Sequence, residues 1–202
     1  APFIGGDIGA GMAALLSQKP EFPFFFFFMG TNGEFVLTLS PTQALAGSVP
    51  LGPALEGIGL SCGALAGVGG EELVITGFNL TPAGLQPVCE SETLEAAHYN
   101  GISGTGYLAL IHILRSLDLV REDGRFNAAA PLPLAQKLAR HLHIRAGQTE
   151  LELPGKLRLT GTDVEEILKV KAAFSLSVHS LLNAAELAPG DLQACCLAGA
   201  LG

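Results

Sequence analysis

A glycine-rich turn separates two apolar runs near the start of the chain. Residues 24–29 read FFFFFM, residues 30–33 read GTNG, and Glu34 opens the second run, Phe35–Leu39. Backbone N–H groups and a threonine hydroxyl at the tip of such a hairpin can cradle a phosphate. An Asn-Gly pair that accepts positive φ is also the commonest short hairpin signal. A plain hairpin without a ligand is therefore the alternative that the local spacing alone favours.

Two further glycine-rich stretches follow. Asn100–Gly106 (NGISGTG) precedes Tyr107–Leu119, whose apolar spacing is helical. Free N–H groups and the helix dipole make such a helix start a ready anion site. The pattern alone is weak, because no parallel strand that leads into it is recognisable and no acidic residue follows at the spacing of a dinucleotide fold. The third stretch, Ala198–Gly202, follows Leu192–Leu197, which is expected to be a buried strand.

The phenylalanine run must position the first turn. It is too apolar for a surface loop and far too short to span a bilayer, which needs about 20 residues. It predicts a strand buried on both faces, in the middle of a sheet covered by helices. Further strands are expected at Phe35–Leu39, Ala44–Val49, Leu73–Thr76, Leu85–Val88, Glu150–Leu153 and Lys156–Leu159.

Four further helices are expected. Asp7 is placed to cap a short helix from Ile8 onward. Pro53 suits the first turn of a second helix, whose several glycines indicate either close packing or contact with a ligand. A third amphipathic helix is expected within Leu134–Ile144. The clearest helix begins at the capping box Thr162–Glu165 and carries an apolar stripe formed by Ile167, Val170, Phe174, Val178 and Leu181.

Composition limits the class of protein. The chain has 202 residues, of which 49% are hydrophobic and 15% charged, enough for one large or two small domains with a sizeable core. A net charge of −8 argues against nucleic-acid or anionic-membrane partners. The sequence shows no apolar stretch long enough for a membrane span and no basic region before Leu16 that would suggest a signal peptide. A cytoplasmic protein is expected.

Cysteine and histidine spacing does not predict a metal site. The four cysteines are Cys62, Cys89, Cys195 and Cys196, with no CxxC pair, and the adjacent pair is expected to be buried in a reduced protein. His141 and His143 would share a face only on a strand, whereas their segment is expected to be helical. No metal-ligating residue is therefore assigned.

Taken together, the motifs resemble the C-terminal region of reductive activators of corrinoid proteins. MGTNGEF resembles the family hairpin D-I-G-T-N-G-E, and GPALEGIGLSCG resembles its G-P-A-F-E-G…I…C-G segment. GISGTGYLALIHILRSLDLVREDGRF resembles G-I-C-G-S-G, a helix and a D/S-G-R-F tail. LTGTDVEEILKVKAAF resembles L-T-x-x-D-V-x-E-x-x-x-A-K-A-A, and CLAGALG resembles the A-G-G-F-G nucleotide loop. Order and approximate spacing match over nearly the whole chain.

This resemblance implies an α/β fold: a ribonuclease H-like, actin-like ATPase lobe with a mixed sheet flanked by helices, from the acetate and sugar kinase, heat-shock ATPase and actin superfamily. Residues 24–202 would form the second lobe. Residues 1–23 would be the remnant of the junction with a preceding lobe, and the chain would be a fragment of a larger protein.

The implied function is that of an ATP-binding lobe that couples ATP hydrolysis to one-electron reduction of a corrinoid Co(II) protein. Its cofactors would be ATP with Mg²⁺. The iron–sulfur cluster of the family would belong only to an N-terminal ferredoxin-like domain absent from this chain. The implied partners are a corrinoid protein or corrinoid-dependent methyltransferase and the preceding lobe, and a homodimer is left open.

The resemblance also assigns residues. It gives Glu34 a catalytic role, orienting metal or water. The residues that it assigns to nucleotide binding are Gly30, Thr31, Asn32, Gly33, Gly104, Thr105, Gly106, Gly199, Ala200 and Gly202.

The chain departs from the family pattern at several positions. Phe28 stands where the hairpin has Asp, Ser103 and Thr105 replace Cys and Ser, and Ala200 and Leu201 replace Gly and Phe. Losing the Asp carboxylate bears on hydrolysis more than on the fold. The alternative function is thus a degenerate, non-hydrolysing docking module for a corrinoid protein or partner subunit. A small-molecule kinase of the same superfamily would need a substrate pocket that the sequence does not display.

Overall fold

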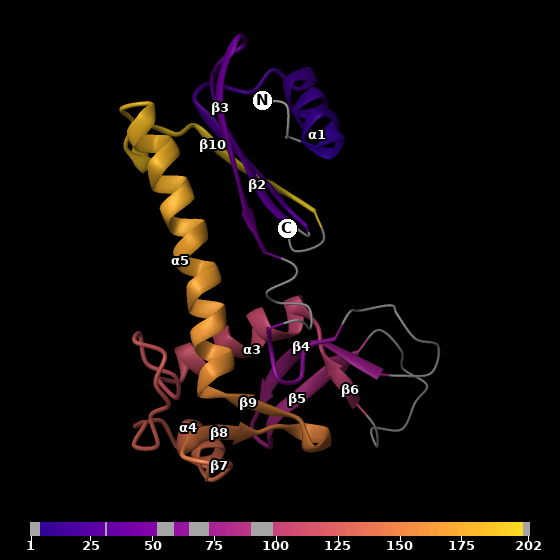
Figure 1. The fold of residues 1–202 in the computed structure, drawn as a ribbon, viewed down its shortest axis with the longest axis vertical. Coiled ribbons are helices and arrows are strands. Elements are labelled where there is room, and N and C mark those ends of the chain that lie inside the picture. The colour runs from indigo at the N-terminus through magenta and orange to yellow at the C-terminus, as the bar shows by residue number, and fades with distance from the viewer. Residues whose placement is uncertain (1–4, 31, 52–58, 65–72, 90–98, 200–202) are drawn as a thin grey trace. The chain divides into compact units, whose positions relative to one another are not determined.

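The computed structural model describes residues 5–30, 32–51, 59–64, 73–89 and 99–199. The chain divides into two compact units (Figure 1). Unit 1 comprises Ala1–Gly52 and Lys169–Gly202, and unit 2 comprises Pro53–Leu168. Helix α5 (Gly161–Ala184) contributes residues to both units.

Unit 1 is built on a four-stranded mixed sheet in the order β10-β1-β2-β3. Its strands are β1 (Phe24–Met29), β2 (Asn32–Ser40), β3 (Gln43–Pro50) and β10 (Ala194–Ala198). Strand β1 pairs antiparallel with β2 and parallel with β10. The predicted mixed sheet is therefore confirmed, and so is the central place of the phenylalanine strand.

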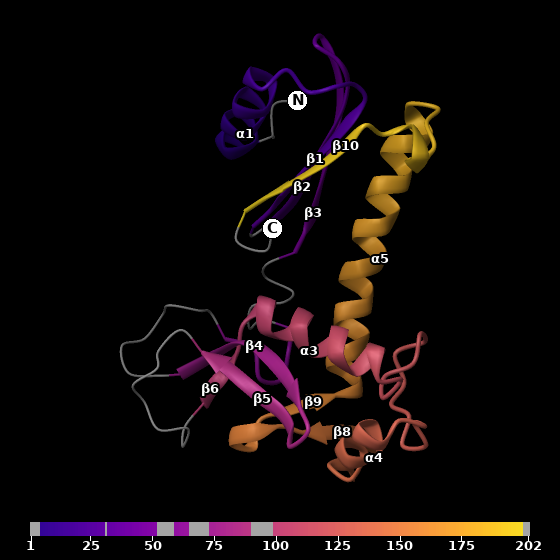
Figure 2. The same cartoon turned by 180° about the vertical axis from the view of Figure 1, so that it is seen from behind.

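Both faces of β1 are buried, as the sequence predicts. Phe25 and Phe27 point to the face that the C-terminal part of α5 covers, where the ring of Phe174 lies 5.6 Å from that of Phe27. Phe24 and Phe26 point to the opposite face, which is covered by α1 (Gly6–Ser17). Figures 1 and 2 show these two helices on opposite sides of the sheet. Alternation along an extended strand divides the phenylalanines between two cores.

The described residues of unit 2 form two three-stranded sheets. One has the order β5-β4-β6, with β4 (Leu73–Thr81), β5 (Gly84–Cys89) and β6 (Tyr99–Ile102). The other has the order β7-β8-β9, with β7 (Leu142–Arg145), β8 (Gln148–Glu152) and β9 (Arg158–Thr160). Among the described residues of this unit, the helices are α3 (Gly104–Ser116), α4 (Pro133–Ala139) and the first turns of α5. Single 3₁₀ turns lie at Pro154–Lys156 in unit 2 and Pro189–Asp191 in unit 1.

The helix expected over Leu134–Ile144 ends early. Helix α4 stops at Ala139, and Leu142–Arg145 forms β7. The residues Ala146 and Gly147 both have positive φ, 49° and 78°, and turn the chain so that β7 pairs antiparallel with β8. Hairpin pairing has overridden the local helical pattern.

The capping box of α5 lies two residues before the predicted one. The Thr160 hydroxyl accepts the N–H of Asp163 at 3.1 Å, and the Asp163 carboxylate accepts the N–H of Thr160 at 2.8 Å. Both residues are buried, whereas Thr162 and Glu165 are exposed. The end of β9 at Thr160 fixes where the helix begins.

Strand β10 is less buried than predicted. It lies at the edge of its sheet, so Cys195 is exposed and Leu197 keeps 62% of its surface in solvent. Cys196 packs on the α1 side, as expected of a core cysteine. All four cysteines are free thiols.

One predicted element cannot be compared with the fold. The start of the helix expected at Pro53 lies outside the described residues. Among the helices that the structure describes, none combines the length and apolar composition needed to cross a bilayer.

Candidate functional site

The first glycine loop is the turn between β1 and β2. Gly30 lies in the turn, and its N–H donates to the carbonyl of Asn32 at 3.0 Å. Gly33 is not in a positive-φ turn, contrary to the prediction. It lies within β2, opposite Met29 and Val49, where a Cβ atom would come within 2.5 Å of Leu51. Thr31 lies outside the described residues.

The third glycine stretch meets this turn. Parallel pairing of β10 with β1 places Ala198 beside Phe28, and Gly199 follows directly. Gly199 has φ +98°, and a Cβ atom there would lie 2.4 Å from the carbonyl oxygen of Met29. Only glycine combines this backbone conformation with such a close approach. Ala200 and Gly202 lie outside the described residues.

Glu34 is half-buried at the same end of the sheet. It lies directly opposite Phe28 in the β1–β2 register, on the face that α1 covers. A Cβ atom built on Gly5, the N-cap of α1, would lie 3.7 Å from Glu34 Oε1. The carboxylate thus lies beside the positive end of a helix whose N-terminus has no side-chain cap. At the position of the family Asp, the ring of Phe28 joins the apolar cluster instead.

The second glycine turn lies in unit 2. The hydroxyl of Ser103, the N-cap of α3, accepts the N–H of Gly106 at 3.2 Å and lies 2.9 Å from the hydroxyl of Thr105. A parallel strand does lead into this turn, contrary to the prediction, because β6 pairs parallel with β4. A Cβ atom at Gly106 would lie 2.5 Å from the Ile75 carbonyl oxygen, so this glycine allows close packing of helix on strand. Gly104 is buried as well, whereas Thr105 is exposed.

The structure therefore brings part of the predicted site together. Gly30, Glu34 and Gly199 gather at one end of the sheet of unit 1, with Asn32 and Gly33 opening the adjacent strand. Gly104–Gly106 belong to unit 2.

Two polar side chains near the second turn were missed by sequence reasoning. Asp163 is 1% exposed, and Tyr107 is fully buried with its hydroxyl 3.3 Å from the N–H of Cys62. Burial, followed by the proximity of Asp163 and Cys62, raises the pKa of Tyr107 well above its usual value near 10. The sequence does carry one signal, the spacing Thr160-x-x-Asp163, which is typical of a capping box.

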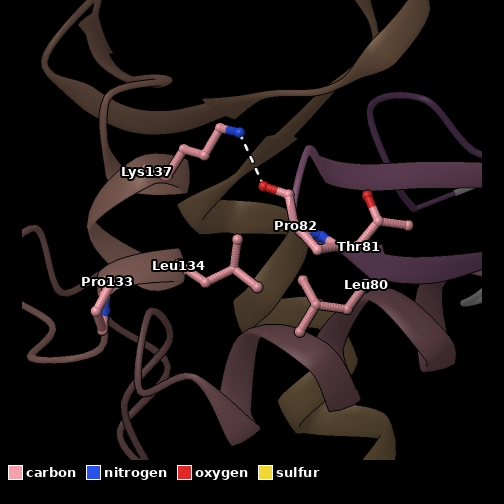
Figure 3. A pocket seen from close by; sticks show the side chains of 6 residues that line it. All are labelled: Leu80, Thr81, Pro82, Pro133, Leu134 and Lys137. Carbon is pink, nitrogen blue, oxygen red and sulfur yellow. Dashed lines mark hydrogen bonds between the residues drawn. The ribbon is translucent and has the colours of Figure 1, made fainter.

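Two surface hollows in unit 2 are lined by residues outside the predicted site. An apolar one of about 510 Å³ lies between the β4–β5 turn and α4, where Lys137 donates to the carbonyl of Pro82 at 2.9 Å (Figure 3). A polar one of about 630 Å³ is lined by Asp123, Gly124, Arg125, Phe126, Gly147, Gln148, Thr149, Gly161, Thr162 and Glu165. In the part of the chain that the structure describes, no three His, Cys, Asp or Glu side chains are grouped so as to hold a metal ion.

Comparison with known proteins identifies the family. The family model described as the C-terminal domain of RACo, the ASKHA domain, matches residues 24–202. A solved structure described as "Reductive activator for corrinoid,iron-sulfur protein" superposes with a TM-score of 0.75 at 22% identity. That likeness covers 100% of this chain and 31% of the activator, so the chain spans less than a third of its length. No curated protein matches the sequence.

The family match and the structural likeness agree with the arrangement of the sheet. A mixed sheet with helices on both faces, and glycine loops at the ends of adjacent strands, is the actin-like ASKHA fold that the sequence predicts. The match covers all but the first 23 residues. The chain belongs to the family of RACo C-terminal ASKHA domains.

Proposed function

We propose that this chain is the ATP-binding lobe of a reductive activator, which couples ATP hydrolysis to one-electron reduction of the Co(II) centre of a corrinoid protein. Residues 24–202 form the second lobe of the activator in this proposal, and residues 1–23 lead into it from a preceding lobe. The electron comes from an iron–sulfur domain elsewhere in the longer protein, and the complete activator acts in the cytoplasm. Family membership supports the role in corrinoid activation.

One observation carries the proposal for nucleotide binding. Parallel pairing of β1 with β10 brings the Gly30 turn and Gly199 to the same end of one sheet, beside a carboxylate. Ligands of open α/β sheets bind at the ends of strands, where loops converge. The Gly30 N–H is already used within the turn, so we assign the phosphate contacts to Thr31, Asn32 and the remaining backbone of the loop.

Glu34 has the chemistry required beside a Mg²⁺-bound phosphate. Mg²⁺ in nucleotide sites usually takes one or two carboxylates and fills its other positions with water and phosphate oxygens. A single half-buried carboxylate fits that requirement. In the proposal, Glu34 orients the metal or the attacking water, and Gly199, Ala200 and Gly202 line the nucleotide.

The first test measures ATP binding by titration calorimetry, on this chain and on the complete protein that carries it. We expect binding that depends on Mg²⁺, and a Glu34→Gln variant that hydrolyses ATP at least about tenfold more slowly. Glu21→Gln, an exposed change in the loop before β1, is the matched control and should leave the rate unchanged. Absence of ATP binding in both proteins would overturn the proposal.

A second test separates the activator from the non-hydrolysing docking module, which Phe28 favours. Phe28→Asp restores the family carboxylate directly opposite Glu34. We expect Mg²⁺-dependent ATPase activity to rise, although two like charges across a strand pair lower the stability of the metal-free protein. Phe28→Asn is the uncharged control. If neither variant changes ATPase activity while corrinoid-protein binding persists, the docking module is the better description.

A further inference from the structure

The carboxylate of Asp163 does more than cap α5. Its Oδ2 accepts the N–H and the hydroxyl of Thr160, each at 2.8 Å, which completes the capping box. Its Oδ1 accepts the N–H of Ser61 at 2.7 Å, from a residue 102 positions earlier in the chain. The cap itself needs only one carboxylate oxygen. The other therefore holds a second segment, Leu60–Ala64, which lies in the same unit.

This segment lies along β6. The N–H of Ile102 donates to the carbonyl of Cys62 at 2.8 Å, and the N–H of Ala64 donates to the carbonyl of Ile102 at 3.0 Å. Gly63 and Ile102 form a parallel bridge. The approach is close enough that a Cβ atom on Gly101 would lie 2.8 Å from the Cys62 carbonyl oxygen.

The same segment also meets the first turn of α3. The N–H of Cys62 donates to the hydroxyl of Tyr107 at 3.3 Å. Ile102 and Tyr107 flank the turn Ser103–Gly106 directly. Both flanks of this turn are thus hydrogen-bonded to Leu60–Ala64, and Asp163 fixes the segment from a third side.

We infer that Asp163 is a positioning residue for the turn Ser103–Gly106, acting through the segment Leu60–Ala64. The inference rests on the proposed function in one respect: the family resemblance assigns Gly104, Thr105 and Gly106 of this turn to nucleotide binding. A carboxylate only accepts hydrogen bonds, and here three donors converge on it. In an Asp163→Asn variant, the side-chain NH₂ group would face either Ser61 or Thr160, and it cannot accept a hydrogen bond from them. Either Ser61 or Thr160 would then lose its partner.

The main experiment is hydrogen–deuterium exchange of the complete protein, comparing Asp163→Asn with wild type. We expect exchange of residues 59–64 and 101–107 to quicken by about tenfold or more, because hydrogen bonds to charged groups contribute most. The hairpin β7–β8 should be unchanged. Asp123→Asn, which alters an exposed carboxylate of the same unit, is the control. Unchanged exchange in both segments, or an equal increase throughout unit 2, would overturn the inference.

Tyr107→Phe serves as a second variant in case Asp163→Asn folds poorly. This change removes only the hydroxyl that accepts the N–H of Cys62. It should quicken exchange in residues 59–64 and 101–107.

ATP affinity separates this inference from the proposed function. We expect Asp163→Asn to raise the KM for ATP several-fold at constant kcat, and Tyr107→Phe to do the same. Altered exchange with an unchanged KM for ATP would show that the turn does not affect nucleotide binding. That result would overturn this inference and leave the proposed function standing. If wild type binds no ATP, the proposed function fails, and with it the nucleotide role of this turn. The exchange result then still decides whether Asp163 holds the segment in place.

Discussion

Gly199 approaches the backbone at the end of β1, next to the first glycine turn. Its φ of +98° and a Cβ position 2.4 Å from the Met29 carbonyl both exclude a side chain. Gly199→Ala should lower the free energy of unfolding by about 1–3 kcal/mol, the cost of a strained backbone conformation. Urea denaturation measures this loss.

Gly190→Ala is the matched control in the same unit. A Cβ atom there would meet nothing within 4 Å, and its φ is not in the left-handed region. Its free energy of unfolding should stay within about 0.5 kcal/mol of wild type. Equal losses in the two variants would contradict the close approach at Gly199.

The raised pKa of Tyr107 predicts how the free energy of unfolding changes at alkaline pH. Burial raises its pKa in the folded protein, whereas in the unfolded chain it ionises near pH 10. Below pH 10 the hydroxyl is protonated in both states and stability is unaffected by it. Above pH 10 only the unfolded chain releases the proton, so the free energy of unfolding should fall by about 1.4 kcal/mol per pH unit from this group.

Comparison with Tyr107→Phe isolates that contribution, because other groups also titrate at high pH. Urea denaturation between pH 9 and 11 should show a shallower decline in the variant than in wild type. Parallel declines would mean that Tyr107 reaches solvent in the folded protein.

The N-terminus of α5 offers a test between two capping boxes that the sequence contains. Thr160 and Asp163 form the one that is observed, and Thr162 and Glu165 the one that was predicted. Thr160→Ala should lower the free energy of unfolding by about 0.5–2 kcal/mol, the usual cost of losing an N-cap. Thr162→Ala, at an exposed position, should cost less. The reverse order in thermal denaturation would contradict the structure.

Elements with a strong pattern were predictable from the sequence. The phenylalanine run could only be a central strand, and β2 to β5, α3 and α5 follow from apolar runs or periodicity. Strand β6 was not predicted, because its four residues, YNGI, carry no hydrophobic pattern and their conformation depends on pairing with β4. Strand β7 was mistaken for helix because its hairpin partner decides its conformation.

The candidate site was also predictable only in part. Gly30, Glu34 and Gly199 could be named because the family motif places them, and strand pairing brings them to one end of a sheet. The roles of Gly33 and Gly106 could not be foreseen. Their lack of a side chain is required by Leu51 and by the Ile75 carbonyl, which are contacts between residues far apart in the chain.

At the scale of the whole molecule, charge is the property most easily tested. The net charge of −8 at pH 7 corresponds to an isoelectric point of about 5.0. Solubility should therefore pass through a minimum near pH 5 and rise again toward pH 7, because charge repulsion keeps molecules apart. Turbidity and light scattering across this range measure the effect. A monotonic solubility profile would contradict it.

The parallel pairing of β1 with β10 also sets the order in which the molecule can be completed during synthesis. Strand β1 leaves the ribosome before α5 and β10, which cover and flank it and lie beyond residue 160. At a synthesis rate of about 5–20 residues per second, the five consecutive phenylalanines remain without α5 and β10 for on the order of ten seconds. An apolar segment of high β-propensity without charge is an aggregation hazard while it is exposed. The same pairing that assembles the candidate site therefore leaves an aggregation-prone strand without one of its neighbours until β10 is made.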